Sequence, residues 1–427
     1  MLEIHSNDIY HGLPVISRDI KGLTAIVTGA NGISGNHQLK VLCESPRWEK
    51  IYALSRRPPH GSWPDHVEHI SVDLLNAPET IAGELAKRGV RADHVFFFAY
   101  AQPTPKAGET VWSQDELVIV NKKLLVNFLE SLELNNTIPK RVLLQLGGKY
   151  YGIHRGPTSC PQVESDPRVL AGPNFYYDQE DYLQAFAKKH QIGWNTTLPS
   201  HIAGAVPDAA MNLCYPLAIY ATVQKYLNRP LEYPGDVEAW EANVSISSAR
   251  ANGYLAEWIV LTEQAKNEIF NAADDCLFTW GKFWPKLAER FQMPWKGPDT
   301  SDDASYETVT MPYDAPRGYG PPGLFRFRFR LATWAKTAEV QKAWAEIAEK
   351  EGLYEKELRD IDRVFGFTDF ALAMNFPISL SMAKAKKLGY FGFVDSTESI
   401  LRVVEEFVDL RMLPPLISPI DSAFEMP

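Results

Sequence analysis

Three glycines near the N-terminus stand at a spacing that can hold a phosphate. Gly29, Gly32 and Gly35 lie in TAIVTGANGISGNHQLKVL, where β-branched residues run into a helix-forming segment. In a strand–turn–helix unit the first glycine permits a tight turn, the second lets the backbone approach a pyrophosphate, and the third lets helix and strand pack closely. We therefore predict a dinucleotide site that also includes Asn31 and Ile33. A plain turn is the alternative.

Two arginines stand near the position that contacts the 2′ group of the ribose in such a dinucleotide. An acidic residue about 20 residues after the glycines would select NAD, but the chain has Ser55, Arg56 and Arg57 there. Guanidinium groups pair with a 2′-phosphate through charge-assisted hydrogen bonds, so the sequence favours NADP(H). A solvated basic turn is the alternative. We expect residues at the carboxyl ends of the third and fourth predicted strands to complete the cofactor site: Asp73, Leu74, Ala99 and Tyr100.

Asp73 has two interpretations of equal weight. It follows the third predicted strand, where its carboxylate can accept a hydrogen bond from the adenine amino group. It can equally cap the N-terminus of the next helix, since aspartate is a preferred N-cap residue.

A lysine and a tyrosine are candidates for the chemistry. The GxxGxxG spacing is typical of short-chain dehydrogenases, in which a catalytic tyrosine and lysine stand four residues apart on one helix. No tyrosine of this chain has a lysine four residues later. Lys149 instead follows the fifth predicted strand in LLQLGGKYYG, and Tyr176 opens the next helix in NFYYDQEDY.

These two stretches carry a family resemblance. The chain resembles the progesterone 5β-reductase and iridoid synthase-like reductases, an atypical branch of the extended short-chain dehydrogenases with G-x-K-H-Y and N-F-Y-Y-x-x-E-D motifs. The resemblance extends along nearly the whole chain, through SRR after the glycine turn, IFNAAD with WGKFWPKLAERF, and SMAKAKKLGYFGF. Two positions depart from the family: Tyr150 replaces its histidine, and Leu198–Pro199 replaces its Arg-Pro.

The resemblance implies transfer of hydride from NADPH to the β-carbon of an α,β-unsaturated carbonyl compound. Negative charge then develops on the carbonyl oxygen, where a phenol can donate a hydrogen bond and a nearby ammonium can stabilise the charge. It assigns these roles to Tyr176 and Lys149. Tyr177 is the rival donor, and a buried aromatic beside a loop cation is the structural alternative.

Other polar residues near this motif have simpler explanations. We interpret Glu180 and Asp181 as acids in a first helical turn, stabilised by the helix dipole rather than used in catalysis. Asn121 is expected within a long helix, where it either orders water or the backbone of the fifth strand, or is a surface amide. An apolar enone needs an apolar cavity, for which the candidate walls, each of them alternatively a core residue, are Phe98, Tyr100, Tyr150, Met211, Met382 and Tyr390.

Other activities remain open on the same fold. Reduction of the carbonyl carbon itself and redox-neutral isomerisation would use the same cofactor site. A regulatory protein that senses NADP without turnover is the non-catalytic alternative. The presence of both Lys149 and Tyr176 argues against such a sensor, because a protein without turnover does not need them.

The elements that must position these residues alternate along the first 200 residues. Short β-rich runs are separated by amphipathic helical stretches, which predicts a doubly wound parallel Rossmann sheet of the α/β class. We expect an N-terminal extension at 1–20, an NADP-binding domain at 21–200 with a returning strand at 268–274, and a smaller, mostly helical substrate lobe at 201–427. Residues 295–325 are rich in Pro, Gly and Asp and predict a long loop. The predicted strands span 24–29, 50–55, 69–72, 94–100, 141–147 and 193–199.

The charge and residue composition of the chain restrict the kinds of ligand and partner it is expected to bind. With 427 residues, a net charge of −10 and a pI near 5.6, the chain is not expected to bind nucleic acid or an anionic membrane. Four dispersed cysteines, no signal-like N-terminus and no long apolar run predict a cytoplasmic protein. His66 and His69 lack companion ligands, so no metal is expected. The predicted partner is a small, largely apolar carbonyl compound, and both a monomer and a homodimer remain open.

Overall fold

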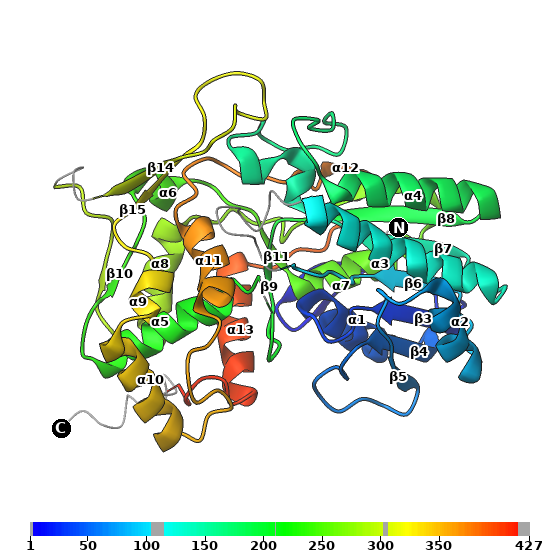
Figure 1. Cartoon of the computed structure of the whole chain (residues 1–427), viewed down its shortest axis with the longest axis horizontal. Coiled ribbons are helices and arrows are strands. Elements are labelled where there is room, and N and C mark those ends of the chain that lie inside the picture. The colour runs from blue at the N-terminus through cyan, green and yellow to red at the C-terminus, as the bar shows by residue number, and fades with distance from the viewer. Residues whose placement is uncertain (1–2, 104–114, 210, 302–305, 417–427) are drawn as a thin grey trace.

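Seven parallel strands form the central sheet in the order β12-β8-β7-β6-β3-β4-β5 (Figure 1). The computed structural model describes residues 3–103, 115–209, 211–301 and 306–416. The strand order reverses on either side of β3, which confirms the predicted doubly wound sheet. The sheet is built from β3 (Leu23–Thr28), β4 (Trp48–Ser55), β5 (Val67–Ser71), β6 (His94–Phe97), β7 (Arg141–Gln145), β8 (Gly193–Pro199) and β12 (Glu268–Ala272).

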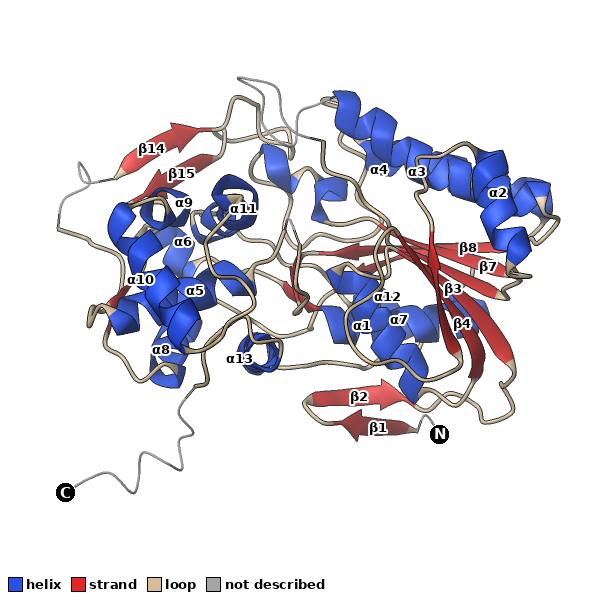
Figure 2. Cartoon of the chain, turned by 60° about the horizontal axis from the view of Figure 1, so that its bottom comes forward, coloured by secondary structure: helices blue, strands red, loops and turns tan. Residues whose placement is uncertain are grey.

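Helices cover both faces of this sheet. Figure 2 shows α2, α3 and α4 on one side of the strands and α1 and α7 on the other. The strands are therefore buried on both faces, which explains their continuous apolar runs such as Val95–Phe97. The covering helices are α1 (Ile33–Glu44), α2 (Pro78–Lys87), α3 (Asp115–Leu134), α4 (Phe175–His190) and α7 (Ala249–Leu261).

A second core lies within the mostly helical C-terminal lobe, beside the sheet (Figure 1). Its largest buried side chains are Trp280, Trp284 and Trp344, around which amphipathic helices pack their apolar faces. The lobe's helices are α5 (Cys214–Tyr226), α6 (Val237–Glu241), α8 (Trp280–Arg290), α9 (Leu331–Ala335), α10 (Ala338–Lys350), α11 (Ile361–Leu372) and α13 (Ser396–Asp409).

Several segments are more ordered than the sequence predicts. The N-terminal extension contains an antiparallel hairpin, and His11 forms a β-bridge with Phe393. The segment 295–325, predicted as a long loop, contains β13, β14 and the first residues of β15; β13 pairs with β10, and β14 pairs with β15, so the prediction was wrong for these residues. The shorter elements are β1 (Ile4–Asn7), β2 (Tyr10–Pro14), β9 (His201–Ala203), β10 (Leu231–Glu232), β11 (Ile246–Ser248), β13 (Trp295–Lys296), β14 (Glu307–Thr310), β15 (Leu324–Phe327) and α12 (Ala383–Lys387).

Candidate functional site

The glycine turn joins β3 to α1, and each glycine there has a different environment. Gly29 has a φ of +64°, and a Cβ at this residue would lie 2.8 Å from the carbonyl oxygen of Phe98. A Cβ at Gly35 would overlap the carbonyl oxygen of Gly29, whereas a Cβ at Gly32 would lie 3.3 Å from that oxygen. Gly29 therefore lets the turn pack against the backbone after β6, and Gly35 lets α1 pack against the turn. Gly32 has no side chain to keep a ligand away from the backbone of the turn.

The start of α1 is suited to an anion. Helix α1 begins at Ile33, and among the described residues no side chain caps its N-terminus. Its first N–H groups are thus left for another acceptor, which is how helix N-termini hold a phosphate. Ser34 in this first turn accepts a hydrogen bond from Gln145 Nε2 at 2.8 Å, which ties the end of β7 to the same place. The residues present fit a dinucleotide.

The segment after β6 borders the glycine turn and is fixed by two polar residues. Thr28 Oγ1 accepts hydrogen bonds from the N–H groups of Phe98 and Ala99, at 3.1 and 3.3 Å. Asn121 on α3 is fully buried; its Oδ1 accepts from Ala101 N at 3.0 Å and its Nδ2 donates to Ala101 O at 2.8 Å. Asn121 is therefore neither a surface amide nor a partner of the fifth strand, because it holds the loop after β6.

Lys149 and Tyr176 come from separate elements and are joined by Asn174. Lys149 lies in a 3-10 turn after β7, and Asn174 caps α4 by accepting from Tyr176 N at 3.2 Å. The amide of Asn174 also donates to Lys149 O at 3.0 Å. The Lys149 ammonium lies 5.2 Å from the ring centre of Phe175 and 5.8 Å from that of Tyr176. Sequence reasoning missed Asn174, although an asparagine before a helix is an N-cap signal.

Burial changes the acidity of both groups. It lowers the pKa of Lys149 from 10.5 to about 7, because desolvation disfavours the ammonium. It raises the pKa of Tyr176 well above that of a free phenol for the same reason. At neutral pH Tyr176 is therefore a protonated donor, and the charge of Lys149 depends on pH.

Tyr176 and its neighbour Tyr177 have different surroundings. A Cβ at Gly147 would lie 3.0 Å from the Tyr176 hydroxyl, which places this hydroxyl at the carboxyl end of β7. The Tyr177 hydroxyl donates to Tyr150 O at 2.6 Å and accepts from Val169 N at 2.8 Å. Tyr177 thus has a structural role, whereas the Tyr176 hydroxyl makes no hydrogen bond to the described residues.

The acidic pair on α4 was misinterpreted. Glu180 lies in the second turn of α4 and is 1% exposed, so the dipole of the first turn does not explain it. Its Oε2 accepts from the Tyr150 hydroxyl at 3.1 Å and pairs with Arg168 at 2.5 Å. Asp181 pairs with the same arginine at 2.7 Å. Tyr150 therefore belongs to a buried polar network; its role as a pocket wall stays a prediction.

The other expected pocket walls separate into two groups. Tyr100 packs in a tilted orientation against Phe175, with ring centres 6.1 Å apart, and so lies beside the candidate catalytic residues. Phe98 packs against the core on the α7 face of the sheet, and its role as a pocket wall stays a prediction. Met382 and Tyr390 are 4% and 3% exposed in the core on the α7 face, where Tyr390 packs 5.3 Å from Trp258. These two are core residues, so their assignment to the pocket was wrong.

Met211 is half-buried in the segment before α5. This segment connects β9 to the C-terminal lobe. The prediction that Met211 contacts a substrate remains a prediction.

Residues near the expected adenosine site make local hydrogen bonds. The Ser55 hydroxyl donates to Arg57 O at 2.6 Å, which shapes the turn that carries the arginines. Asp73 accepts from Leu75 N at 3.0 Å, and Leu74 O accepts from Asn127 at 3.1 Å. The N-cap of α2 is Ala77, so the interpretation of Asp73 as that cap was wrong.

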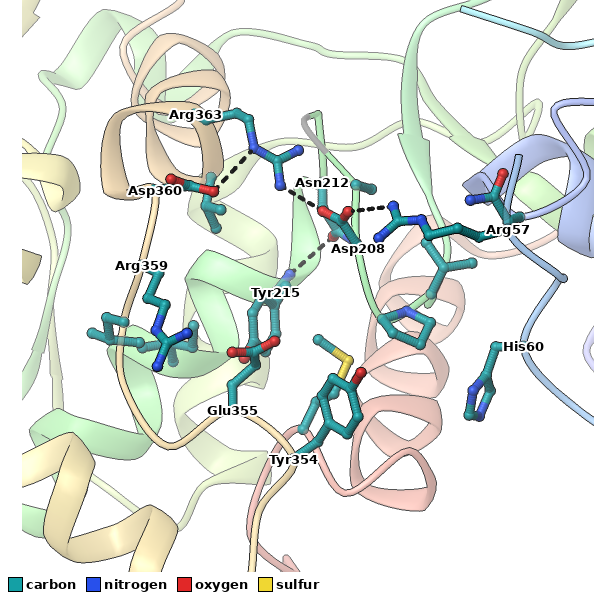
Figure 3. Close-up of a pocket in the computed structure, with 18 of the residues that line it drawn as sticks. Arg57, His60, Asp208, Asn212, Tyr215, Tyr354, Glu355, Arg359, Asp360 and Arg363 are labelled. Atoms are coloured by element: carbon teal, nitrogen blue, oxygen red, sulfur yellow. Dashed lines mark hydrogen bonds and ion pairs between the residues drawn. The ribbon is translucent and has the colours of Figure 1, made fainter. Parts of the chain in front are cut away.

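Arg57 also reaches the C-terminal lobe. Its guanidinium pairs with Asp208 at 2.8 Å, and Asp208 pairs at 2.5 Å with Arg363 of α11 (Figure 3). These residues and Asn31 line a cavity of about 910 Å³ between the arginine turn and the lobe. Sequence reasoning missed Asp208 and Arg363, because nothing local in the sequence marks a contact across more than 150 residues.

Within the described residues, no group of three or more His, Cys, Asp or Glu side chains could hold a metal ion. None of the described helices is both long and apolar enough to cross a lipid bilayer.

Residues 25–311 match the family described as the PRISE-like Rossmann-fold domain. The chain belongs to this family. The resemblance inferred from the two motifs is thereby confirmed, and the protein is an oxidoreductase of the short-chain dehydrogenase/reductase superfamily. The Rossmann fold of this family is one that binds dinucleotides.

Curated relatives of this PRISE-like protein align over most of its length. An (S)-8-oxocitronellyl enol synthase of Catharanthus roseus is 28% identical over 401 residues, covering 91% of this chain and 92% of the relative. A 3-oxo-Delta(4,5)-steroid 5-beta-reductase of Arabidopsis thaliana is also 28% identical over 401 residues, with coverages of 91% and 93%.

Solved structures show the same fold at lower identity. UDP-glucose 4-epimerase of Thermotoga maritima superposes with a TM-score of 0.55 at 15% identity, covering 91% of this chain and 99% of that chain. A dTDP-glucose 4,6-dehydratase of Streptomyces venezuelae, solved with NAD, gives 0.56 at 12% identity, with coverages of 91% and 98%. These likenesses concern the fold, an extended Rossmann domain with a C-terminal lobe.

Proposed function

We propose that this PRISE-like protein reduces the conjugated double bond of a small α,β-unsaturated carbonyl compound, with NADPH as the hydride donor. The observation that carries the proposal is that buried Lys149 and half-buried Tyr176 lie together where β7 ends, with Asn174 bonded to the backbone of both. The hydrogen bond from Gln145 to Ser34 connects this point to the start of α1.

The protein's own groups supply stabilisation of the developing charge. NADPH, when bound, would supply the hydride that adds to the β-carbon, which would leave negative charge on the carbonyl oxygen. Tyr176, whose pKa is raised by burial, keeps its proton and donates a hydrogen bond to that oxygen. The Lys149 ammonium stabilises the same negative charge at pH values below its pKa of about 7. The α-carbon then takes its proton from solvent.

The relatives' names support a conjugated carbonyl substrate. The Arabidopsis relative is named for a 3-oxo steroid with a 4,5 double bond, which is an enone. The Catharanthus relative is named for an enol product, the protonated form of the enolate proposed here. The aromatic rings of Tyr100 and Phe175 beside the pair suit a largely apolar substrate.

The choice of NADPH is supported by the turn after β4. Arg56 and Arg57 stand where an acidic residue would bind the 2′-hydroxyl of NAD. The side chain of Arg57 is 68% exposed, so it can turn to an incoming phosphate. Two guanidinium groups at this point favour a 2′-phosphate.

The test follows the absorbance of NADPH with a panel of enones, enals and matched saturated ketones. We expect oxidation with the conjugated compounds and a saturated carbonyl product. Tyr176→Phe and Lys149→Met should each lose most of this rate. Turnover of saturated ketones alone would overturn the conjugate reduction, and absence of NADPH binding in calorimetry would overturn the whole proposal.

A further inference from the structure

The carboxylate of Asp208 forms an ion pair with Arg57, the guanidinium proposed to bind the 2′-phosphate of the cofactor. Asp208, between β9 and α5, lies between Arg57 of the arginine turn and Arg363 of α11, at 2.8 and 2.5 Å (Figure 3). Asn31 of the glycine turn lines the same cavity. The chain therefore places one of its own anions beside two elements of the proposed dinucleotide site.

The electrostatics of this contact favour exchange. Burial opposes ionisation of Asp208, but hydrogen bonds from Arg363 and Arg57 outweigh it and lower the pKa of the carboxyl. The side chains of Arg57, Asp208 and Arg363 are 68%, 43% and 40% exposed. Ion pairs this exposed contribute about 0–1 kcal/mol, so an anion of greater charge can displace one of them at small cost.

We propose that Asp208 competes with the 2′-phosphate of NADPH for Arg57, and that Arg363 retains Asp208 once the phosphate has taken its place. The inference rests on the proposed use of NADPH. A 2′-phosphate carries more negative charge than a carboxylate and offers three acceptor oxygens, so it binds the guanidinium more strongly. Asp208 is thereby a residue that sets the strength of phosphate selection, from a part of the chain outside the Rossmann turn.

The contact also links cofactor binding to the lobe. Arg57 follows β4, whereas Asp208 and Arg363 stand on the other side of the 910 Å³ cavity. Phosphate binding breaks the one described ion pair of Arg57 and leaves the pair between Asp208 and Arg363 intact. Asp360 approaches Arg363 at 3.9 Å from the start of α11 and makes no described ion pair with Arg57, which makes it a matched control.

The experiment uses two fragments that lack the nicotinamide. Binding of adenosine 2′,5′-bisphosphate and of adenosine 5′-monophosphate to the full chain is measured by calorimetry for the wild type, Asp208→Asn and Asp360→Asn. We expect Asp208→Asn to tighten the bisphosphate by about 3- to 10-fold, at most about 1.4 kcal/mol, and to change the monophosphate less than about twofold. Asp360→Asn should change neither.

A second variant tests the role of Arg363. Arg363→Gln leaves Asp208 with Arg57 as its partner, so the bisphosphate should bind a few-fold more weakly. This loss should vanish in the Asp208→Asn background. A loss of equal size in both backgrounds would mean that Arg363 binds the phosphate itself, which overturns its assigned role.

The outcomes separate the inference from the proposed function. If the wild type prefers the bisphosphate and Asp208→Asn leaves that preference unchanged, or tightens both fragments equally, the inference is wrong while the use of NADPH stands. If the wild type shows no preference for the bisphosphate, the proposed use of NADPH fails, and the inference fails with it.

Discussion

The two ends of the proposed cofactor site differ in how their charged groups are held. At the catalytic end, Lys149 is 9% exposed, and Asn174 bonds to its carbonyl oxygen and to the N–H of Tyr176. At the phosphate end, Arg57 and Asp208 form a cross-lobe pair that is largely open to water. One end is buried and fixed before any ligand binds, whereas the other exchanges partners.

This difference decides which physical effect each end can use. Burial moves the pKa of Lys149 by several units, to about 7, and keeps Tyr176 protonated, so the catalytic end works through desolvation. Exposed guanidinium groups keep their charge and are screened by salt, so the phosphate end works through adjustable charge pairing. The protein is therefore rigid at the proposed catalytic site and adaptable where it recognises the cofactor phosphate.

The largest expected effect is at the catalytic end. Tyr176→Phe removes the proposed donor and should lower kcat/KM for an enone by about 100-fold or more. Tyr177→Phe is the matched control: its hydroxyl holds Tyr150 and Val169, so its loss should cost about 1–3 kcal/mol of unfolding free energy and only a few-fold in rate. Rates of NADPH oxidation and urea unfolding measure the two effects. The opposite assignment would follow if Tyr177→Phe lost the rate instead.

The next effect is at the phosphate end. Replacing Arg56 and Arg57 by alanine removes charge-assisted hydrogen bonds worth about 1.5–3 kcal/mol each, so NADPH should bind about 100-fold or more weakly. NADH, which lacks the phosphate, should lose little. Dissociation constants for both cofactors provide the measurement. Equal losses would show that the arginines do not touch the 2′-phosphate.

The pH dependence of the reaction rate distinguishes the two ends, because the catalytic end carries Lys149, whose pKa burial lowers to about 7. As pH rises through about 7 the buried Lys149 loses its proton, so kcat/KM should fall by up to about tenfold per pH unit. Lys149→Met should be slow and nearly independent of pH in this range. A profile that stays flat in the wild type between pH 6 and about 9 would contradict the role of the ammonium.

The lowered pKa of Lys149 also predicts how the free energy of unfolding changes with pH. Between pH about 7 and 10.5 the unfolded chain keeps the Lys149 proton that the folded chain has released. Unfolding therefore takes up a proton in this window, and the contribution of Lys149 to stability becomes less unfavourable as pH rises. Lys149→Met should be stabilising, most of all below pH 7. Denaturant unfolding at pH 6 and 9 checks the expected loss of this pH dependence.

The smallest effect is that of salt. Raising ionic strength from about 0.05 to 0.5 M shortens the Debye length to about 4 Å, so NADPH binding at the exposed arginines should weaken several-fold. The turnover number at saturating cofactor should change less than about twofold, because Lys149 is buried. An equal salt effect on both quantities would show that the two ends do not differ in exposure when the cofactor is bound.

The sequence alone determined what depends on neighbours along the chain. The alternation of strands and helices, the glycine turn and the two short motifs are local patterns, and the doubly wound sheet and the family follow from them. Strand β8 begins and ends as predicted, at Gly193 and Pro199, because the tryptophan and threonines between them favour a strand and glycine and proline interrupt one.

Tertiary structure decided the contacts that bring distant residues together. Only packing shows that Tyr177 bonds to backbone, that Met382 and Tyr390 lie in the core on the α7 face, and that Asp208 meets Arg57. An apolar or charged residue looks the same in sequence whether it faces a pocket, a core or a partner from another lobe. The direction of its side chain is set by which elements pack against it, and that depends on the whole fold.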